Sequence, residues 1–150
     1  MIVAAICVVI SAHKKHIALE NAEKIFACSY HCGGGMEGSS TDIGLYVNDK
    51  CVAVLSYSHV PYNGAEEESF TKEVPFEAIE KIREICKERE ILGWGELSDS
   101  KILLLDAPTT SISITYGEDE CYTFKSNQNL PNKKGDGVFS EICNVLESYK

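Results

Sequence analysis

Clustered basic residues are scarce in this chain, which argues against functions that depend on binding phosphates. The formal net charge over 150 residues is −9, and adjacent basic residues occur only as pairs such as Lys14-Lys15 and Lys133-Lys134. Phosphate contacts need several Lys or Arg side chains on one surface. We therefore expect no nucleic-acid partner and no non-specific binding to an anionic membrane.

The sequence also lacks an apolar run long enough to cross a membrane. Residues 1–10 are almost wholly apolar, but a spanning helix needs about 20 such residues. A signal peptide fits less well, because no Lys or Arg precedes the run. We interpret residues 1–10 as a core element within a helical or strand extension over residues 1–23. We predict a cytoplasmic protein, with an exported or membrane-tethered form as the alternative.

The sequence also lacks an even number of cysteines. The chain has seven, at positions 7, 28, 32, 51, 86, 121 and 143, and an odd number cannot pair completely within one chain. Several occupy positions where a small apolar residue fits, such as Cys86 and Cys143 on predicted helix faces. We expect mostly free thiols and a reducing compartment.

The run Gly33-Gly34-Gly35-Met36 does not have the context of a phosphate-binding loop. Its glycines lead into a strand pattern instead of a helix, and no Lys-Ser/Thr follows. We interpret the glycines as a bulge or a close approach of two backbones. Ligand binding by Gly33, Gly34, Gly35 and Met36 is the alternative.

Cys28, His31 and Cys32 are residue types that bind zinc or iron, but no second Cys/His pair follows at the spacing of structural zinc sites. If this segment is a strand, Cys28 and Cys32 share one face and His31 lies on the other. The same geometry is poor for a Cys32–His31 nucleophile pair, and no Gly-x-Ser-x-Gly elbow occurs. We predict no cofactor, with zinc at these three residues as the alternative.

Three further side chains are candidates for ligand contacts. Trp94 stands between Gly93 and Gly95, and it suits either a ligand platform or a core anchor. Asn127 and Gln128 have amides that can hydrogen-bond a ligand, although a solvated loop explains them more simply.

Hydrophobic periodicity predicts the elements of the fold. Apolar residues alternate over residues 41–47 and 51–57, which predicts a hairpin with a turn at Asn48-Asp49-Lys50. A polar edge strand over 66–74 follows, then a helix from Pro75 to about 91 with Gly93 as its left-handed cap. Its apolar stripe is Phe76, Ile79, Ile82, Ile85 and Cys86.

The remaining segments complete the prediction. Residues 112–116 and 121–125 form a second hairpin, and residues 138–149 form a closing helix. Residues 13–26 suit a helix with Ser11 as its cap, or a strand over 24–31, and residues 101–106 suit a buried strand. We predict one α+β domain over residues 1–150: an antiparallel sheet of two hairpins and an edge strand, with two or three helices on one face.

Several short motifs give the chain a family resemblance. Gly33-Gly34-Gly35-Met36, Trp94, residues 105–110 (LDAPTT) and residues 126–131 (SNQNLP) resemble those of small bacterial domains of unknown function, over roughly residues 24–149. The resemblance implies an α+β fold and a bacterial origin, and it transfers no catalytic residues.

Taken together, these features favour a non-catalytic binding or protein-interaction module. Its partner would be another protein or a second copy that covers the open face of the sheet. The alternative is a metal- or cysteine-dependent enzyme that uses residues 28–35.

Overall fold

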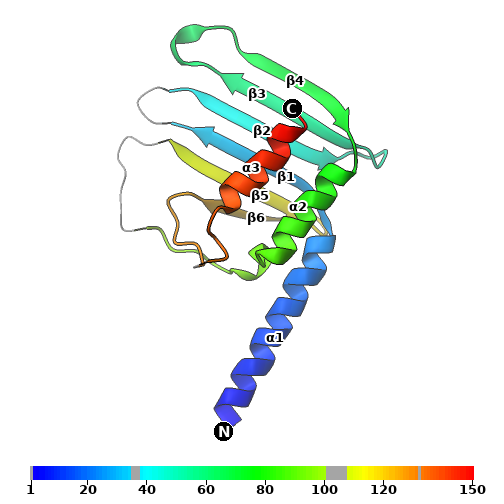
Figure 1. The fold of residues 1–150 in the computed structure, drawn as a ribbon, viewed down its shortest axis with the longest axis vertical. Helices are drawn as coiled ribbons and strands as arrows, with labels where there is room; N and C mark the ends of the chain where they lie inside the picture. Colours follow the sequence, from blue (N-terminus) through cyan, green and yellow to red (C-terminus); the bar gives the residue numbers. More distant parts are fainter. Residues whose placement is uncertain (1, 35–37, 101–107, 132) are drawn as a thin grey trace.

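The protein folds around one antiparallel sheet, which the computed structural model shows together with three α-helices (Figure 1). The structure describes residues 2–34, 38–100, 108–131 and 133–150, and for residues 2–11 and 63 it describes the backbone alone. Within these ranges six strands lie in the order β4-β3-β2-β1-β5-β6, and each neighbouring pair is antiparallel. This is the α+β class that the sequence predicts.

The first four strands follow one another along the chain as a meander. They are β1 (Ile25–Gly33), β2 (Ser40–Val47), β3 (Ala53–Val60) and β4 (Glu68–Val74). After β4 the chain crosses one side of the sheet as a helix and returns next to β1. There β5 (Thr109–Tyr116) and β6 (Glu120–Lys125) form the second hairpin. β1 is therefore paired along both edges.

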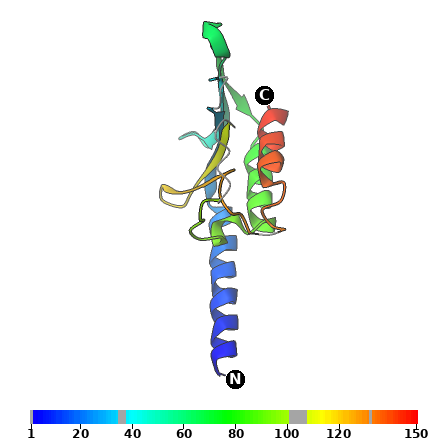
Figure 2. The same ribbon diagram turned by 90° about the vertical axis from the view of Figure 1, so that its left-hand side faces the viewer.

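Two helices, α2 (Glu77–Glu88) and α3 (Val138–Ser148), cover the same side of the sheet. Figure 2 shows the sheet edge-on, with both helices on one side. Apolar residues spaced three or four apart on α2 face inward, as in an amphipathic helix. The core between the layers includes Ile79, Ile82, Ile142, Leu146, Ile43, Leu45, Leu55, Ile112, Ile114 and Phe124, each at most 1% exposed.

The chain begins with a long helix, α1 (Ile2–Glu23), which extends well beyond the body of the molecule (Figures 1 and 2). Its last turns pack on the body through the buried side chains of Ala18 and Ala22. A Cβ at Gly93 would lie 3.2 Å from the Cβ of Ala18, so a small residue at each position lets the chains approach closely. No helix in the described part of the chain is long and apolar enough to span a bilayer.

Both predicted hairpins, the edge strand and the last two helices are confirmed, but several details differ. The helix at the N-terminus runs through Ser11, which therefore does not cap it, and the strand begins at Ile25. The described core starts only at Ala18, so the backbone of residues 2–10 extends away from the core instead of forming part of it (Figure 1).

Local chemistry explains the other differences. The predicted turn at Asn48-Asp49-Lys50 is confirmed: the N–H of Cys51 donates to the carbonyl of Asn48 at 2.9 Å, and the Asn48 side chain accepts hydrogen bonds from the N–H groups of Lys50 and Val52. The left-handed residue of this turn is Cys51 (φ 59°). The left-handed residue after α2 is Glu90 (φ 53°) and not Gly93, which lies in the short helix η2 (Ile91–Gly93).

One further prediction, that Phe76 belongs to the apolar stripe of α2, is wrong. Phe76 is 42% exposed because it precedes the first turn of α2 and does not belong to its buried stripe. Between β3 and β4 the chain forms the short helix η1 (Tyr62–Gly64). The strand predicted over residues 101–106 lies outside the described residues.

Candidate binding face on the open side of the sheet

The open face is the side of the sheet opposite α2 and α3, and alternation along each strand decides which side chains it carries. On β1, Cys28, Tyr30 and Cys32 lie on the helix side, whereas Ser29 and His31 lie on the open side. The pairing of the strands extends this alternation into rows across the sheet. Its central residues are Ser69, Thr71, Ser56, Ser58, Asp42, Gly44, Ser29, His31, Ser111, Ser113, Thr123 and Lys125.

A hydrogen-bonded pair, His31 and Asp42, lies near the middle of the open face. The two residues are directly opposite each other on β1 and β2, and Nδ1 of His31 lies 2.6 Å from Oδ1 of Asp42. A carboxylate only accepts hydrogen bonds, so Nδ1 carries the proton in this arrangement. About half of each side chain is exposed, at 47% and 56%. The pair is therefore accessible to a partner.

Gly33 leaves the space in which the imidazole of His31 lies. A Cβ at position 33 would be only 2.9 Å from Nε2 of His31 and 3.1 Å from the Cβ of Ser40. The first glycine of the triplet is thus a close-approach position. Gly34 has a φ of +84°, which favours glycine for backbone reasons. Gly35 and Met36 lie outside the described residues.

Small hydroxyl side chains surround the pair. Ser113 and Thr123 are hydrogen-bonded to each other across β5 and β6 at 2.8 Å. Ser56 donates to the carbonyl of Gly44 at 3.4 Å, and a Cβ at Gly44 would lie 2.7 Å from that hydroxyl oxygen. Short side chains and a central glycine therefore occupy the part of the face around Gly44.

Charge is sparse on the open face although the chain as a whole is strongly acidic. The formally charged residues among the described strand members of this face are Asp42, Glu73 and Lys125, and Glu67, just before β4, accepts a hydrogen bond there from Ser58 at 3.2 Å. The acidic residues of α2, in contrast, lie on its exposed side, as Glu77, Glu80 and Glu84 do. Depletion of charge and exposure of small polar residues distinguish this surface from the rest of the molecule.

The cysteines of β1 are on the other side of the sheet, away from His31. Cys28 is buried, and burial raises its pKa well above the ordinary value. Cys32 approaches the hydroxyl of Thr110 at 3.7 Å and lies beside Tyr30. Burial and the neighbouring thiols of Cys143 and Cys32 raise the pKa of Tyr30 to about 12. Burial thus disfavours the thiolate of Cys28, and the thiolate is the nucleophilic form of cysteine.

The remaining candidates lie away from the open face. Trp94 packs edge-on against Phe124, with ring centroids 5.4 Å apart, and its Nε1 donates to the carbonyl of Arg89 at 2.9 Å. These contacts are those of a core anchor. Gln128 accepts a hydrogen bond from the N–H of Lys125 at 2.9 Å, and the carbonyl of Asn127 accepts one from the N–H of Ser100 at 2.7 Å.

Gln128 also lines a shallow pocket of about 390 Å³ between the loop after β6 and the start of α3. Its polar and apolar lining includes Leu130, Asp136 and Phe139. Trp94 is not among its lining residues, so the structure does not bring the predicted ligand-contacting residues into one site.

No family model matches the chain, and no curated protein matches it. In the part of the chain that the structure describes, no group of three or more His, Cys, Asp or Glu side chains is arranged to hold a metal ion. Of the predicted metal ligands, Cys28 and Cys32 lie on the helix side of β1, and His31 lies on the open side.

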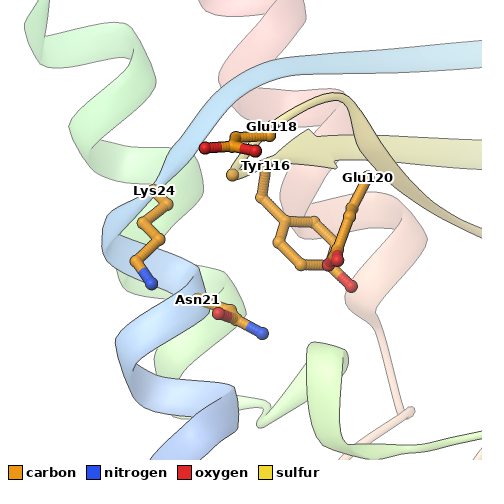
Figure 3. A pocket seen from close by; sticks show the side chains of 6 residues that line it. Asn21, Lys24, Tyr116, Glu118 and Glu120 are labelled. Carbon is orange, nitrogen blue, oxygen red and sulfur yellow. The ribbon is translucent and has the colours of Figure 1, made fainter.

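A second hollow, of about 490 Å³, lies where the end of α1 meets the β5–β6 turn. Figure 3 shows Asn21 on α1, and Lys24 directly after this helix, opposite Tyr116, Glu118 and Glu120. The N–H of Gly117 donates to the carbonyl of Lys24 at 3.3 Å, which joins the helix end to the turn. Burial is the largest cause that raises the pKa of Tyr116, and the neighbouring charge of Glu120 raises it further. We interpret this hollow as the junction of two elements.

Sequence reasoning did not identify Asp42 or the hydroxyl rows. The signal was present in the alternation of residues 41–47, whose polar members include Asp42 and Gly44. Identifying His31 as the partner of Asp42 requires the register of β1 against β2, which places the two residues opposite each other.

Proposed function

We propose that this chain is a non-catalytic protein-interaction module, and that its open face pairs with the open face of a second copy. The observation that carries this proposal is the low charge density of the open face on a chain with a net charge of −9. Interface cores are depleted of charged residues relative to other protein surfaces. Six free cysteines in the described chain support a reducing compartment, and we propose the cytoplasm.

The size of the open face suits a stable interface. Six strands spaced about 4.8 Å apart and about seven residues long cover roughly 25 Å by 25 Å. Two such faces together bury about 1,200 Å², which is at the lower end of the standard range of about 1,200–2,000 Å².

The chemistry of the face also suits self-pairing. In a twofold interface the same patch of each copy contacts its counterpart, so a self-pairing surface must not repel itself. Here the carboxylate of Asp42 is hydrogen-bonded to His31, and the neighbouring residues are mainly Ser and Thr. Their small side chains allow two sheets to approach to about 10 Å, the usual distance for stacked sheets.

Sedimentation velocity over a range of protein concentrations tests this proposal. We expect the unmodified chain to form dimers, and we expect Ser29→Arg, at the centre of the open face, to be monomeric. Ser140→Arg adds the same side chain to an exposed position on α3 and should leave the dimer intact. A chain that stays monomeric at high concentration would overturn the proposal, as would equal association of both variants.

A further inference from the structure

The N-terminal half of α1 leaves the body of the protein. Ala18 is buried, whereas every residue from 12 to 17 is exposed, including Ile17 at 42%. Figures 1 and 2 show the same helix continuing away from the sheet and from α2 and α3. The helix therefore projects into the surroundings for several turns.

The sequence of the projecting part is apolar over its full length. Residues 2–12 read IVAAICVVISA, with Ser11 as the polar residue and no charge. In three turns of helix the side-chain positions are distributed around the whole axis, so this composition leaves no polar stripe that could face water. A helix that is hydrophobic all round needs an apolar environment on every side. A groove on a partner protein covers one stripe, whereas a bilayer surrounds a helix completely.

Basic residues follow directly where this uncharged apolar segment ends. His13, Lys14, Lys15 and His16 follow it directly and are exposed, and the first acidic residue of the chain is Glu20. Lys15 forms an ion pair with Glu90 at 3.1 Å and keeps 59% of its side chain exposed. The acidity of the whole chain, on which the prediction of no membrane binding was based, does not extend to this end.

We propose that α1 is an interfacial membrane anchor. In this arrangement residues 2–12 enter one leaflet of an anionic bilayer, and Lys14 and Lys15 lie among the lipid headgroups. At about 1.5 Å per residue, residues 2–12 cover about 16 Å, so they reach from the headgroups into the hydrocarbon core, which is roughly 30 Å thick. Basic residues beside a buried apolar segment strengthen binding to anionic lipids. The acidic domain stays in water.

Co-sedimentation with vesicles tests the anchor. The full chain is mixed with vesicles of phosphatidylcholine alone and with vesicles containing 3:1 phosphatidylcholine and phosphatidylglycerol, at low salt. We expect stronger binding to the anionic vesicles. Each Lys near an anionic surface contributes about 1 kcal/mol, so Lys14→Gln/Lys15→Gln should weaken binding at least tenfold. Lys50→Gln/Lys133→Gln removes the same charge at exposed positions outside the open face and should bind like the unmodified chain.

The apolar part is tested with a second pair of variants. Val9→Glu places a charge within the projecting segment and should abolish binding to both kinds of vesicle. Phe76→Glu places the same charge at an exposed apolar position of the body, 42% exposed and outside the open face, and should leave binding unchanged. Circular dichroism verifies that all variants are folded.

Three results would overturn the proposal. The first is no binding of the unmodified chain to either vesicle. The second is equal binding by Val9→Glu and Phe76→Glu. The third is a chain that ignores vesicles and forms oligomers that Val9→Glu dissociates, which would identify a second copy as the partner of α1.

Discussion

Phe124 offers the sharpest test of how the core is held together. Its side chain is fully buried, and its ring lies 5.4 Å from Trp94 and 5.2 Å from Phe139, measured between centroids. Each aromatic pair adds about 0.5–1.5 kcal/mol beyond the burial of area. Phe124→Leu keeps an apolar side chain but removes these two ring contacts and a third with Tyr122, whose ring centroid lies 6.3 Å away. We therefore expect the free energy of unfolding to fall by about 1–3 kcal/mol.

Urea unfolding followed by circular dichroism measures this loss, with an unchanged m-value as the check that the unfolded state is the same. Phe76→Leu is the matched control, because Phe76 is 42% exposed and its loss should cost less than about 1 kcal/mol. A double-mutant cycle with Trp94→Leu should give a coupling energy of at least about 0.5 kcal/mol. A loss below 0.5 kcal/mol for Phe124→Leu, or zero coupling, would refute Trp94 as a core anchor.

Other consequences can be measured on the same protein. Ile82→Ala should lower the free energy of unfolding by about 2–5 kcal/mol, because Ile82 is fully buried on α2; Glu84→Ala, on the exposed side of the helix, is the control. Burial raises the pKa of Cys86 to about 12 and that of Cys28 well above its ordinary value. At pH 8 maleimide should therefore label the exposed Cys51 and Cys121 quickly and leave these two unmodified, as peptide mapping would show. Hydrogen bonds from Lys134 and then Lys15 hold the pKa of Glu90 below its usual 4.5. The folded chain thus keeps this carboxylate charged to lower pH than the unfolded chain does. The resulting stability is present above pH 4.5 and is lost as the pH falls through the lowered pKa, so Glu90→Gln should flatten this decline. Gly33→Ala should displace the imidazole of His31 from Asp42, which the His31 ring signals in an NMR spectrum would reveal.

Much of the fold could be predicted because its periodicity is clear. The alternation of Ile43, Leu45 and Val47 with polar residues defines β2, and the spacing of Ile79, Ile82 and Cys86 defines α2. The boundary between α1 and β1 was ambiguous, because Ile25 and Phe26 suit both a helix and a strand. Tertiary contacts decide it: the carbonyl of Ile25 accepts two hydrogen bonds from Arg83 of α2.

The candidate site was harder to predict than the fold. Cys28 and Cys32 attract attention because their chemistry is versatile, but on this strand they face the core layer. The centre of the open face consists mainly of Ser and Thr, which occur in every sequence and do not by themselves indicate a site. Its character arises only when six strands align, and that alignment depends on registers that local patterns do not determine.

The position of β1 between two hairpins has a consequence for synthesis. β1 pairs with β2 soon after it is made, but its other edge must wait for β5, whose first residue is Thr109. At about 5–20 residues per second, the roughly 80 residues in between take about 4–16 s to produce. During that time one edge of the central strand has unpaired backbone groups, which can join another chain. We therefore expect the yield of soluble protein to be sensitive to pauses in translation between β1 and β5.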